Sequence, residues 1–237
     1  GGMASLGVAL SPVWHFAEGA TGSFFDTFLL LGNPQNADAH VTLTYLLDTG
    51  EVITAPVTIA ANQRRTINPE VSPGVGLPDA RLQDAQFAIS ITSDVPIVAE
   101  RSMYWSGKAQ PWGEGHGSPG LVAPALAWDL AEGRVGGAQE FHTYILVSNP
   151  QSAAADLTVT YLRETGEPIV KTYSVRATAR LTIDVNAVPE LADQHVGARV
   201  TVTNNTPVIV ERSMYWNSGG IFWAGGSNGM GIPVAVP

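Results

Sequence analysis

The chain has 237 residues, of which 45% are hydrophobic and 14% are charged, and its net charge is −9 with a pI near 4.9. This apolar content suits one large or two ordinary domains with packed cores and excludes a disordered chain. The acidic balance disfavours binding to nucleic acid or to an anionic membrane surface. The sequence has no cysteine, which excludes disulfides and thiolate metal ligands. It also has no apolar run of the about 18–20 residues that a membrane-spanning helix needs.

The N-terminal residues 1–13 are mostly apolar but carry no basic segment, so they do not form an intact signal peptide. A similar stretch returns at residues 120–127. Apolar area left in water costs about 25 cal/mol per Å2, so we expect the N-terminal segment to lie as a strand against a sheet edge. Short connections favour pairing within its own domain. The alternative is β-strand addition to a neighbouring subunit.

An internal repeat organises the chain. Residues 100–105 read Glu-Arg-Ser-Met-Tyr-Trp, and residues 211–216 repeat them letter for letter. Such identity within one chain indicates a duplication. Further segments recur in the same order, with residues 14–19 matching 128–133, 28–35 matching 144–151, and 42–46 matching 158–162. We place the boundary near residues 123–126, which predicts one domain over 1–123 and a second over 124–237.

The hydrophobic residues follow a period of two. Val41, Leu43 and Tyr45 alternate with threonines, and the same alternation returns at residues 157–161. One apolar face and one hydroxyl-bearing face are typical of an antiparallel sheet that is buried on one side. Glycine and proline separate about seven such segments in each copy. We predict an all-β fold with two tandem antiparallel β-sandwich domains of the immunoglobulin-like class.

Turn signals stand between these segments. Residues 48–51 (Asp-Thr-Gly-Glu) and 164–167 (Glu-Thr-Gly-Glu) predict hairpins in which glycine takes a positive φ. Residues 94–96 (Asp-Val-Pro) and 205–207 (Asn-Thr-Pro) predict a second tight connection in each copy. The first copy also holds extra residues within 69–82, where proline and glycine predict a surface loop.

Four motifs carry a resemblance to a known family. They are residues 14–19 (Trp-His-Phe-Ala-Glu-Gly), 31–34 (Leu-Gly-Asn-Pro), 100–105, and 115–117 (Gly-His-Gly). The chain resembles repeats of secreted and surface proteins from actinobacteria, chloroflexi and related bacteria. This resemblance implies an immunoglobulin-like sandwich, an extracellular or cell-surface location after removal of a signal peptide, and no assigned activity. The chain departs from the family at Ser102 and Ser213, which replace proline, and at residues 226–228, which lack the family's histidine.

Charged residues recur inside apolar segments of both copies. Such residues are usually paired, because an isolated buried charge is costly. Strand alternation sends Glu100 and Arg101 to opposite faces, so they do not pair with each other. We expect structural ion pairs between Arg101 and Glu18 and between Arg212 and Glu132. The alternative is a polar recognition site in each copy.

Aromatic residues recur in the same region. The candidates for ligand binding are Tyr104, Trp105, Trp112, Tyr215, Trp216 and Trp223. Exposed tyrosine and tryptophan side chains stack on sugar rings, whereas buried ones fill a core or a domain junction. Burial of Trp105 and Trp112 would therefore count against a sugar-binding role.

The sequence contains no recognisable catalytic constellation. The histidines show no metal-ligand spacing, no nucleophile elbow is present, and the glycine-rich residues 113–120 and 225–231 lack the lysine of a phosphate loop. We expect no enzyme activity, cofactor or metal. We predict an extracellular structural or interaction module (a cell-surface spacer, adhesion or assembly subunit) that contacts other extracellular proteins or its own copies. The alternative is a carbohydrate-binding accessory module of a secreted hydrolase.

Overall fold

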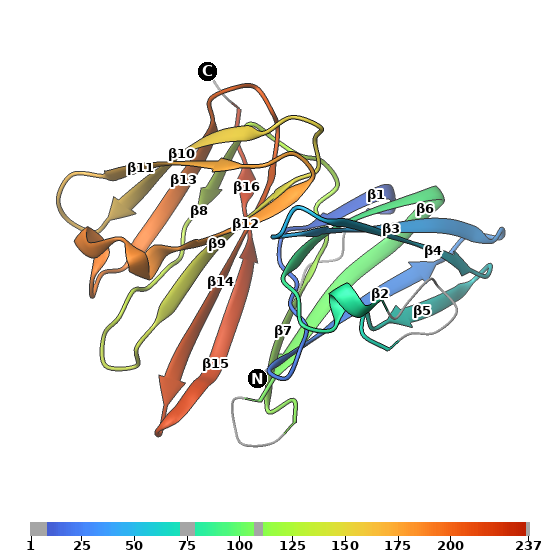
Figure 1. The fold of residues 1–237 in the computed structure, drawn as a ribbon, viewed down its shortest axis with the longest axis horizontal. Coiled ribbons are helices and arrows are strands. Elements are labelled where there is room, and N and C mark those ends of the chain that lie inside the picture. The colour runs from blue at the N-terminus through green and yellow to red at the C-terminus, as the bar shows by residue number, and fades with distance from the viewer. Residues whose placement is uncertain (1–8, 72–78, 107–110, 236–237) are drawn as a thin grey trace.

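The computed structural model describes residues 9–71, 79–106 and 111–235. Within these ranges the fold is all-β with antiparallel sheets, and the only helices are three short 3-10 turns (Figure 1). These turns are Ala80–Leu82, Val185–Ala187 and Pro189–Leu191. No helix in this part of the chain is long and apolar enough to cross a membrane.

The first copy contributes a seven-stranded sheet system. Its strands are β1 (Ser11–Phe16), β2 (Phe25–Asn33), β3 (Ala39–Leu47), β4 (Val52–Ile59), β5 (Gln63–Ile67), β6 (Phe87–Trp105) and β7 (Glu114–Pro119). The long strand β6 pairs with four of the other strands. The first part of β6 pairs with β3 and β1, and its last part pairs with β2 and β7. One strand therefore connects both halves of the sheet system.

The second copy forms two sheets, ordered β11-β10-β13-β8-β16 and β12-β9-β14-β15. Its strands are β8 (Ala127–Leu130), β9 (His142–Asn149), β10 (Ala155–Arg163), β11 (Ile169–Val175), β12 (Ala179–Asp184), β13 (Val196–Val202), β14 (Ile209–Ser218), β15 (Ile221–Met230) and β16 (Ile232–Pro233). By sequence, β13 and β14 correspond to the two halves of β6.

The connection predicted at residues 94–96 is wrong, because β6 runs through it. The register of β6 with β1 shifts between Ser11 and Val13, and this irregularity absorbs the bend without ending the strand. In the second copy the equivalent residues do separate β13 from β14, where Asn205 takes a φ of 59°. The two predicted hairpins are confirmed, with Gly50 at a φ of 89° and Gly166 at 85°.

Each copy has its own hydrophobic cluster. Strand β4 shows the expected period of two, since its residues alternate strictly between exposed and buried. The cluster of the first copy centres on Trp14, Phe16 and Leu43, and that of the second copy on Trp128 and Tyr161. Ala17 belongs by sequence to the first copy but packs in the second cluster. The two copies are therefore in direct contact.

The predicted N-terminal strand is described only in part. Residues 1–8 lie outside the described residues, as do residues 72–78 of the predicted loop. From Ser11 onward the segment forms β1, which pairs with β6 of its own copy. The connection to the second copy is held by backbone bridges from His15 to Leu121 and from Ala125 to Val208.

Candidate functional site

The repeated charged residues meet where the two copies touch. Strands β14 and β15 of the second copy lie beside β1 and β7 of the first (Figure 1). Strand alternation turns Glu211, Ser213 and Tyr215 of β14 toward the first copy, where all three are buried. This contact is the candidate site.

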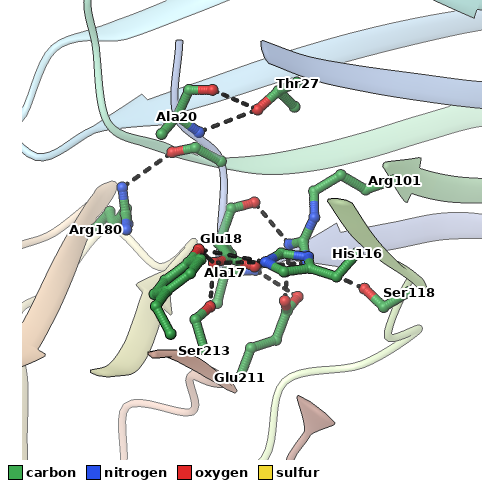
Figure 2. Close-up of polar contacts among 12 residues, drawn as sticks. Ala17, Glu18, Ala20, Thr27, Arg101, His116, Ser118, Arg180, Glu211 and Ser213 are labelled. Carbon is green, nitrogen blue, oxygen red and sulfur yellow. Dashed lines mark hydrogen bonds and ion pairs between the residues drawn. The ribbon is translucent and has the colours of Figure 1, made fainter. Parts of the chain in front are cut away.

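Arg101 lies at the centre of the contact and is fully buried. Its guanidinium donates to Glu18 Oε2 and to Glu211 Oε2, each at 2.8 Å, and Figure 2 shows the three side chains converging. The same group donates to the backbone carbonyl of Glu18 at 2.8 Å. Because Glu211 comes from the second copy, a single arginine joins the two copies.

The remaining carboxylate oxygens also have partners. Glu18 Oε1 accepts hydrogen bonds from the hydroxyls of Ser213 and, at 3.0 Å, Tyr215. Glu211 Oε1 accepts from the backbone N–H of Ala17 at 2.8 Å. Arg180 of β12 adds a hydrogen bond of 3.1 Å to the carbonyl of Gly19. Pairing of this kind makes buried charges tolerable, although the Nε atoms of Arg101 and Arg180 are buried without a hydrogen-bond partner among the described residues.

The buried site shifts the pKa values of its acidic and basic groups. Burial disfavours charge on Glu18, but His116, Arg101 and the two hydroxyl donors outweigh it and lower the Glu18 pKa. Burial, with a smaller repulsion from Glu18, raises the pKa of Glu211 despite the attraction of Arg101. Burial lowers the pKa of His116 to about 4, so its imidazole is neutral at pH 7. Arg101 is therefore the cation that holds Glu18 charged at neutral pH.

Aromatic side chains extend the contact. Trp105 Nε1 donates to the carbonyl of Trp223 at 2.7 Å, and the ring of Trp105 lies 5.2 Å from that of Tyr215. Tyr215 and Trp223 stack with centroids 4.4 Å apart. Trp105 and Tyr215 are 1% and 4% exposed. Of the predicted ligand-binding residues, these two are therefore inaccessible, because they fill the junction between the copies.

A second aromatic group stays on the surface of the first copy. Phe28, Tyr104 and Trp112 contact one another with centroids 5.6–5.9 Å apart. Trp112 is 55% exposed and Tyr104 is 36% exposed. Trp112 Nε1 donates to Asp26 Oδ2 at 2.6 Å, which fixes the ring. The residues expected to bind a ligand thus divide into a buried group and this exposed one.

The second Glu–Arg pair lies in a more open setting. Arg212 donates to Glu132 at 2.7 Å, but the Glu132 side chain is 64% exposed, against 4% for Glu18. Arg212 also donates to Ser227, which stands where the first copy has His116. Trp216, the counterpart of Trp105, is half-buried beside Phe141 at 5.5 Å. Both expected Glu–Arg pairs are present, but only the pair of Arg101 and Glu18 is covered by the other copy.

A cleft of about 550 Å3 opens beside the buried charges. Both copies line it, with Glu18, Asp48 and Arg81 on one side and Arg180 and Tyr215 on the other. No group of three or more histidine, aspartate or glutamate residues in the described part of the chain could hold a metal ion. The buried charges contact one another and the backbone, so their geometry suits a structural clamp.

The sequence indicated some of these residues and missed others. It singled out Glu18 and Arg101 by their recurrence, but it gave no reason to expect Glu211 or His116 beside them. Glu211 lies in a six-residue sequence identical to that of Glu100, so local sequence could not distinguish the two. The available signal was the duplication itself, since two copies in one chain have surfaces that can meet.

No family model matches the chain, and no curated protein matches it. Protein 1070 of Thermotoga maritima is 14% identical with a TM-score of 0.43, over 48% of this chain and 97% of its own. The Anabaena sensory rhodopsin transducer is 25% identical with a TM-score of 0.33, over 41% of this chain and 91% of its own. A protein described as secreted, from Parabacteroides distasonis, is 11% identical with a TM-score of 0.23, over 96% and 83%. With TM-scores this low, these likenesses assign neither a fold family nor a function.

Proposed function

We propose that the chain is an extracellular structural or interaction module made of two tandem immunoglobulin-like sandwiches held in one fixed orientation. It acts as a spacer or assembly subunit and performs no catalysis. The observation that carries this proposal is the buried contact of Arg101 with Glu18 and Glu211, which ties the two copies together.

The setting of these charges supports a structural role. The Arg101 and Glu211 side chains have no exposed surface, and Glu18 is 4% exposed. Removing such charges from water is costly unless the partners keep a defined geometry, so the cluster favours one orientation of the copies over others. A general acid or a nucleophile must instead reach a substrate. The cluster therefore suits orientation better than chemistry.

The extracellular location rests on sequence features. The chain has no cysteine, so export exposes no thiol to oxidation. Its motifs resemble those of bacterial secreted and surface repeats. Its acidic balance suits a surface protein that binds neither nucleic acid nor anionic lipid.

Two measurements test this proposal. Small-angle X-ray scattering of the purified chain at low concentration should fit one rigid body with the dimensions of this structure. Protease added to intact cells that make the protein should digest it without lysis. Scattering from two independently moving domains, or protection from protease until the cells are lysed, would contradict the proposal. So would turnover of ester, peptide or glycoside substrates that is lost on His116→Gln.

A carbohydrate-binding accessory module is the second candidate, and the exposed Tyr104 and Trp112, packed on the half-buried Phe28, favour it. Aromatic faces of this kind stack on sugar rings. A glycan array with the wild type and Trp112→Ala separates the candidates. The structural proposal expects no glycan signal for either protein. A signal that Trp112→Ala abolishes and Val170→Ala, an exposed substitution on β11, retains would establish the sugar-binding function.

A further inference from the structure

We propose that copies of this chain associate head to tail, repeating between chains the contact that joins the two copies within one chain. The proposal rests on the assembly role given above and names its partner: a second copy of this chain. The first copy presents an unused outer face, and the second copy presents an unused socket.

The internal contact defines these two surfaces. The outer face belongs to the second copy, and its members are Tyr144, Arg180, Glu211, Ser213, Tyr215 and Trp223. The socket belongs to the first copy, and its members are Glu18, Phe25, Arg101, Trp105 and His116. Glu211 reaches Arg101, Tyr215 reaches Glu18, and Trp223 contacts Phe25.

The duplication places the same outer face on the first copy, where nothing in the described part of the chain covers it. The counterparts are Phe28, Arg64, Glu100, Ser102, Tyr104 and Trp112. Five of the six residue types are unchanged, and the sixth is phenylalanine for tyrosine. Arg64, Glu100, Tyr104 and Trp112 are exposed. The first copy thus keeps the residues of an interface without a partner for them.

This outer face is already in the shape of its buried counterpart. Trp112 takes a φ of 58° and Trp223 a φ of 47°, an uncommon backbone conformation for a tryptophan. Trp112 contacts the rings of Tyr104 and Phe28, and Trp223 contacts those of Tyr215 and Tyr144, although Tyr104 and Trp112 are tilted at 5.7 Å where Tyr215 and Trp223 stack at 4.4 Å. A preorganised surface binds without the cost of ordering its side chains. Exposed aromatic patches of this kind mark interaction sites.

The second copy holds the matching socket. Arg212 and Glu132 correspond to Arg101 and Glu18, and Trp216 beside Phe141 corresponds to Trp105 beside Phe25. Arg101 binds two carboxylates, whereas Arg212 binds one. Docking of an outer face would bring Glu100 to Arg212 as its second carboxylate and the Tyr104 hydroxyl to Glu132. Ser227 replaces His116 in this socket, so the repeated contact has no buried histidine.

The contact is heterologous, because the outer face and the socket are different surfaces. One chain carries one free surface of each kind, at opposite ends of its pair of copies. Such contacts produce closed rings where the rotation allows and open filaments where it does not. Either product is larger than a monomer, and substitution on one of the two surfaces leaves the other able to bind.

Sedimentation velocity over a range of concentrations tests this inference. The wild type should shift from monomer to larger species as concentration rises. Glu100→Arg on the outer face and Trp216→Ala in the socket should each remain monomeric, whereas Val170→Ala should behave as the wild type. Circular dichroism checks that each variant is folded, and Phe141→Ala, a second socket variant, replaces Trp216→Ala if the latter is not.

Mixing the variants provides the sharper result. The intact socket of Glu100→Arg and the intact outer face of Trp216→Ala should form a one-to-one complex that cannot grow. A wild type that stays monomeric at every concentration overturns the inference, as does association that these variants do not alter. Neither result affects the proposed function if scattering of the monomer still fits one rigid body and protease still digests the protein on intact cells.

Discussion

Glu100 and Glu211 occupy the same place in two identical six-residue sequences, yet Glu100 is exposed and Glu211 is fully buried. The same contrast holds between Tyr104 and Tyr215. The outward face of β14 lies against the first copy, whereas the outward face of β6 meets no other copy. The role of each residue is therefore set by what covers it, and the same sequence serves as surface in one copy and as junction in the other.

Arg101 and Arg212, whose side chains lie on the other face of β6 and β14, also differ between the two copies. Arg101 binds two carboxylates that are almost fully buried, and Arg212 binds one that is mostly exposed. An exposed ion pair contributes little to stability because water screens it, whereas loss of one partner from a buried group leaves charges unpaired. The two pairs therefore offer matched experiments.

Arg101→Ala should have the largest effect. It leaves Glu18 and Glu211 buried without a cation, so we expect a loss of about 3–5 kcal/mol in the free energy of unfolding. Arg212→Ala should lose less, about 1–3 kcal/mol, because Arg212 is itself buried but its partner Glu132 is exposed and stays solvated when the arginine is removed. Differential scanning calorimetry measures both. Equal losses for the two variants would show that contact between the copies adds nothing to the first pair.

Acid should weaken the first copy more than the second. Burial lowers the pKa of both His15 and His116 from 6.5 to about 4. The folded pKa lies below the unfolded one, so the unfolded chain binds more protons and stability is lost as pH falls from 6.5 toward 4. At about 1.4 kcal/mol per pKa unit, each buried histidine accounts for roughly 3 kcal/mol. Urea unfolding at a series of pH values measures this loss.

The variant His116→Gln tests how much this one histidine contributes to the pH dependence of stability. Glu18 has a lowered pKa and loses its contribution only at lower pH, while Glu211 has a raised pKa and acts in the opposite direction. The difference in pH dependence between wild type and His116→Gln cancels the effect of Glu211 and reports His116 together with its influence on the Glu18 pKa. If the stability of His116→Gln depended on pH as that of the wild type does, protonation of His116 would not be the cause of the acid destabilisation.

Glu211→Gln should have a moderate effect and Glu100→Gln almost none. The glutamine keeps the size of the side chain and an oxygen for the Ala17 N–H, but it loses the charge opposite Arg101. Hydrogen bonds to charged groups are worth roughly 1.5–3 kcal/mol, whereas an exposed substitution changes stability by about 0.5 kcal/mol or less. Thermal unfolding of the two variants side by side gives the comparison. A loss from Glu100→Gln as large as that from Glu211→Gln would mean that burial of Glu211 is not the cause.

Much of the fold could be predicted from the sequence because it is encoded locally. The alternation in β4 and the glycine turns at Gly50 and Gly166 depend on neighbouring residues alone. The continuity of β6 could not be predicted, because a tight connection and a register shift with β1 use the same Asp-Val-Pro residues. Whether that bend ends a strand depends on pairing with a segment far away in sequence.

The candidate site, like the fold, could be predicted only in part. The recurrence of Glu18 and Arg101, with the cost of unpaired buried charge, predicted which residues would meet. The third partner could not be predicted, since Glu211 differs from Glu100 only through the packing of one copy on the other. For the same reason, the sequence could not show which of the aromatic candidates are buried and which are exposed. Trp105 lies in the junction and Trp112 on the surface, although the sequence treats both as repeated tryptophans.

A double-mutant cycle on Arg101 and Glu211 tests most directly whether this pair joins the copies. The unfolding free energies of the wild type, Arg101→Gln, Glu211→Gln and the double variant give the coupling energy between the two side chains. The buried geometry predicts a coupling of about 2 kcal/mol or more, against about zero for the same cycle on Arg212 and Glu100 at a concentration where the chain is monomeric. A coupling below about 0.5 kcal/mol for Arg101 and Glu211 would contradict the account.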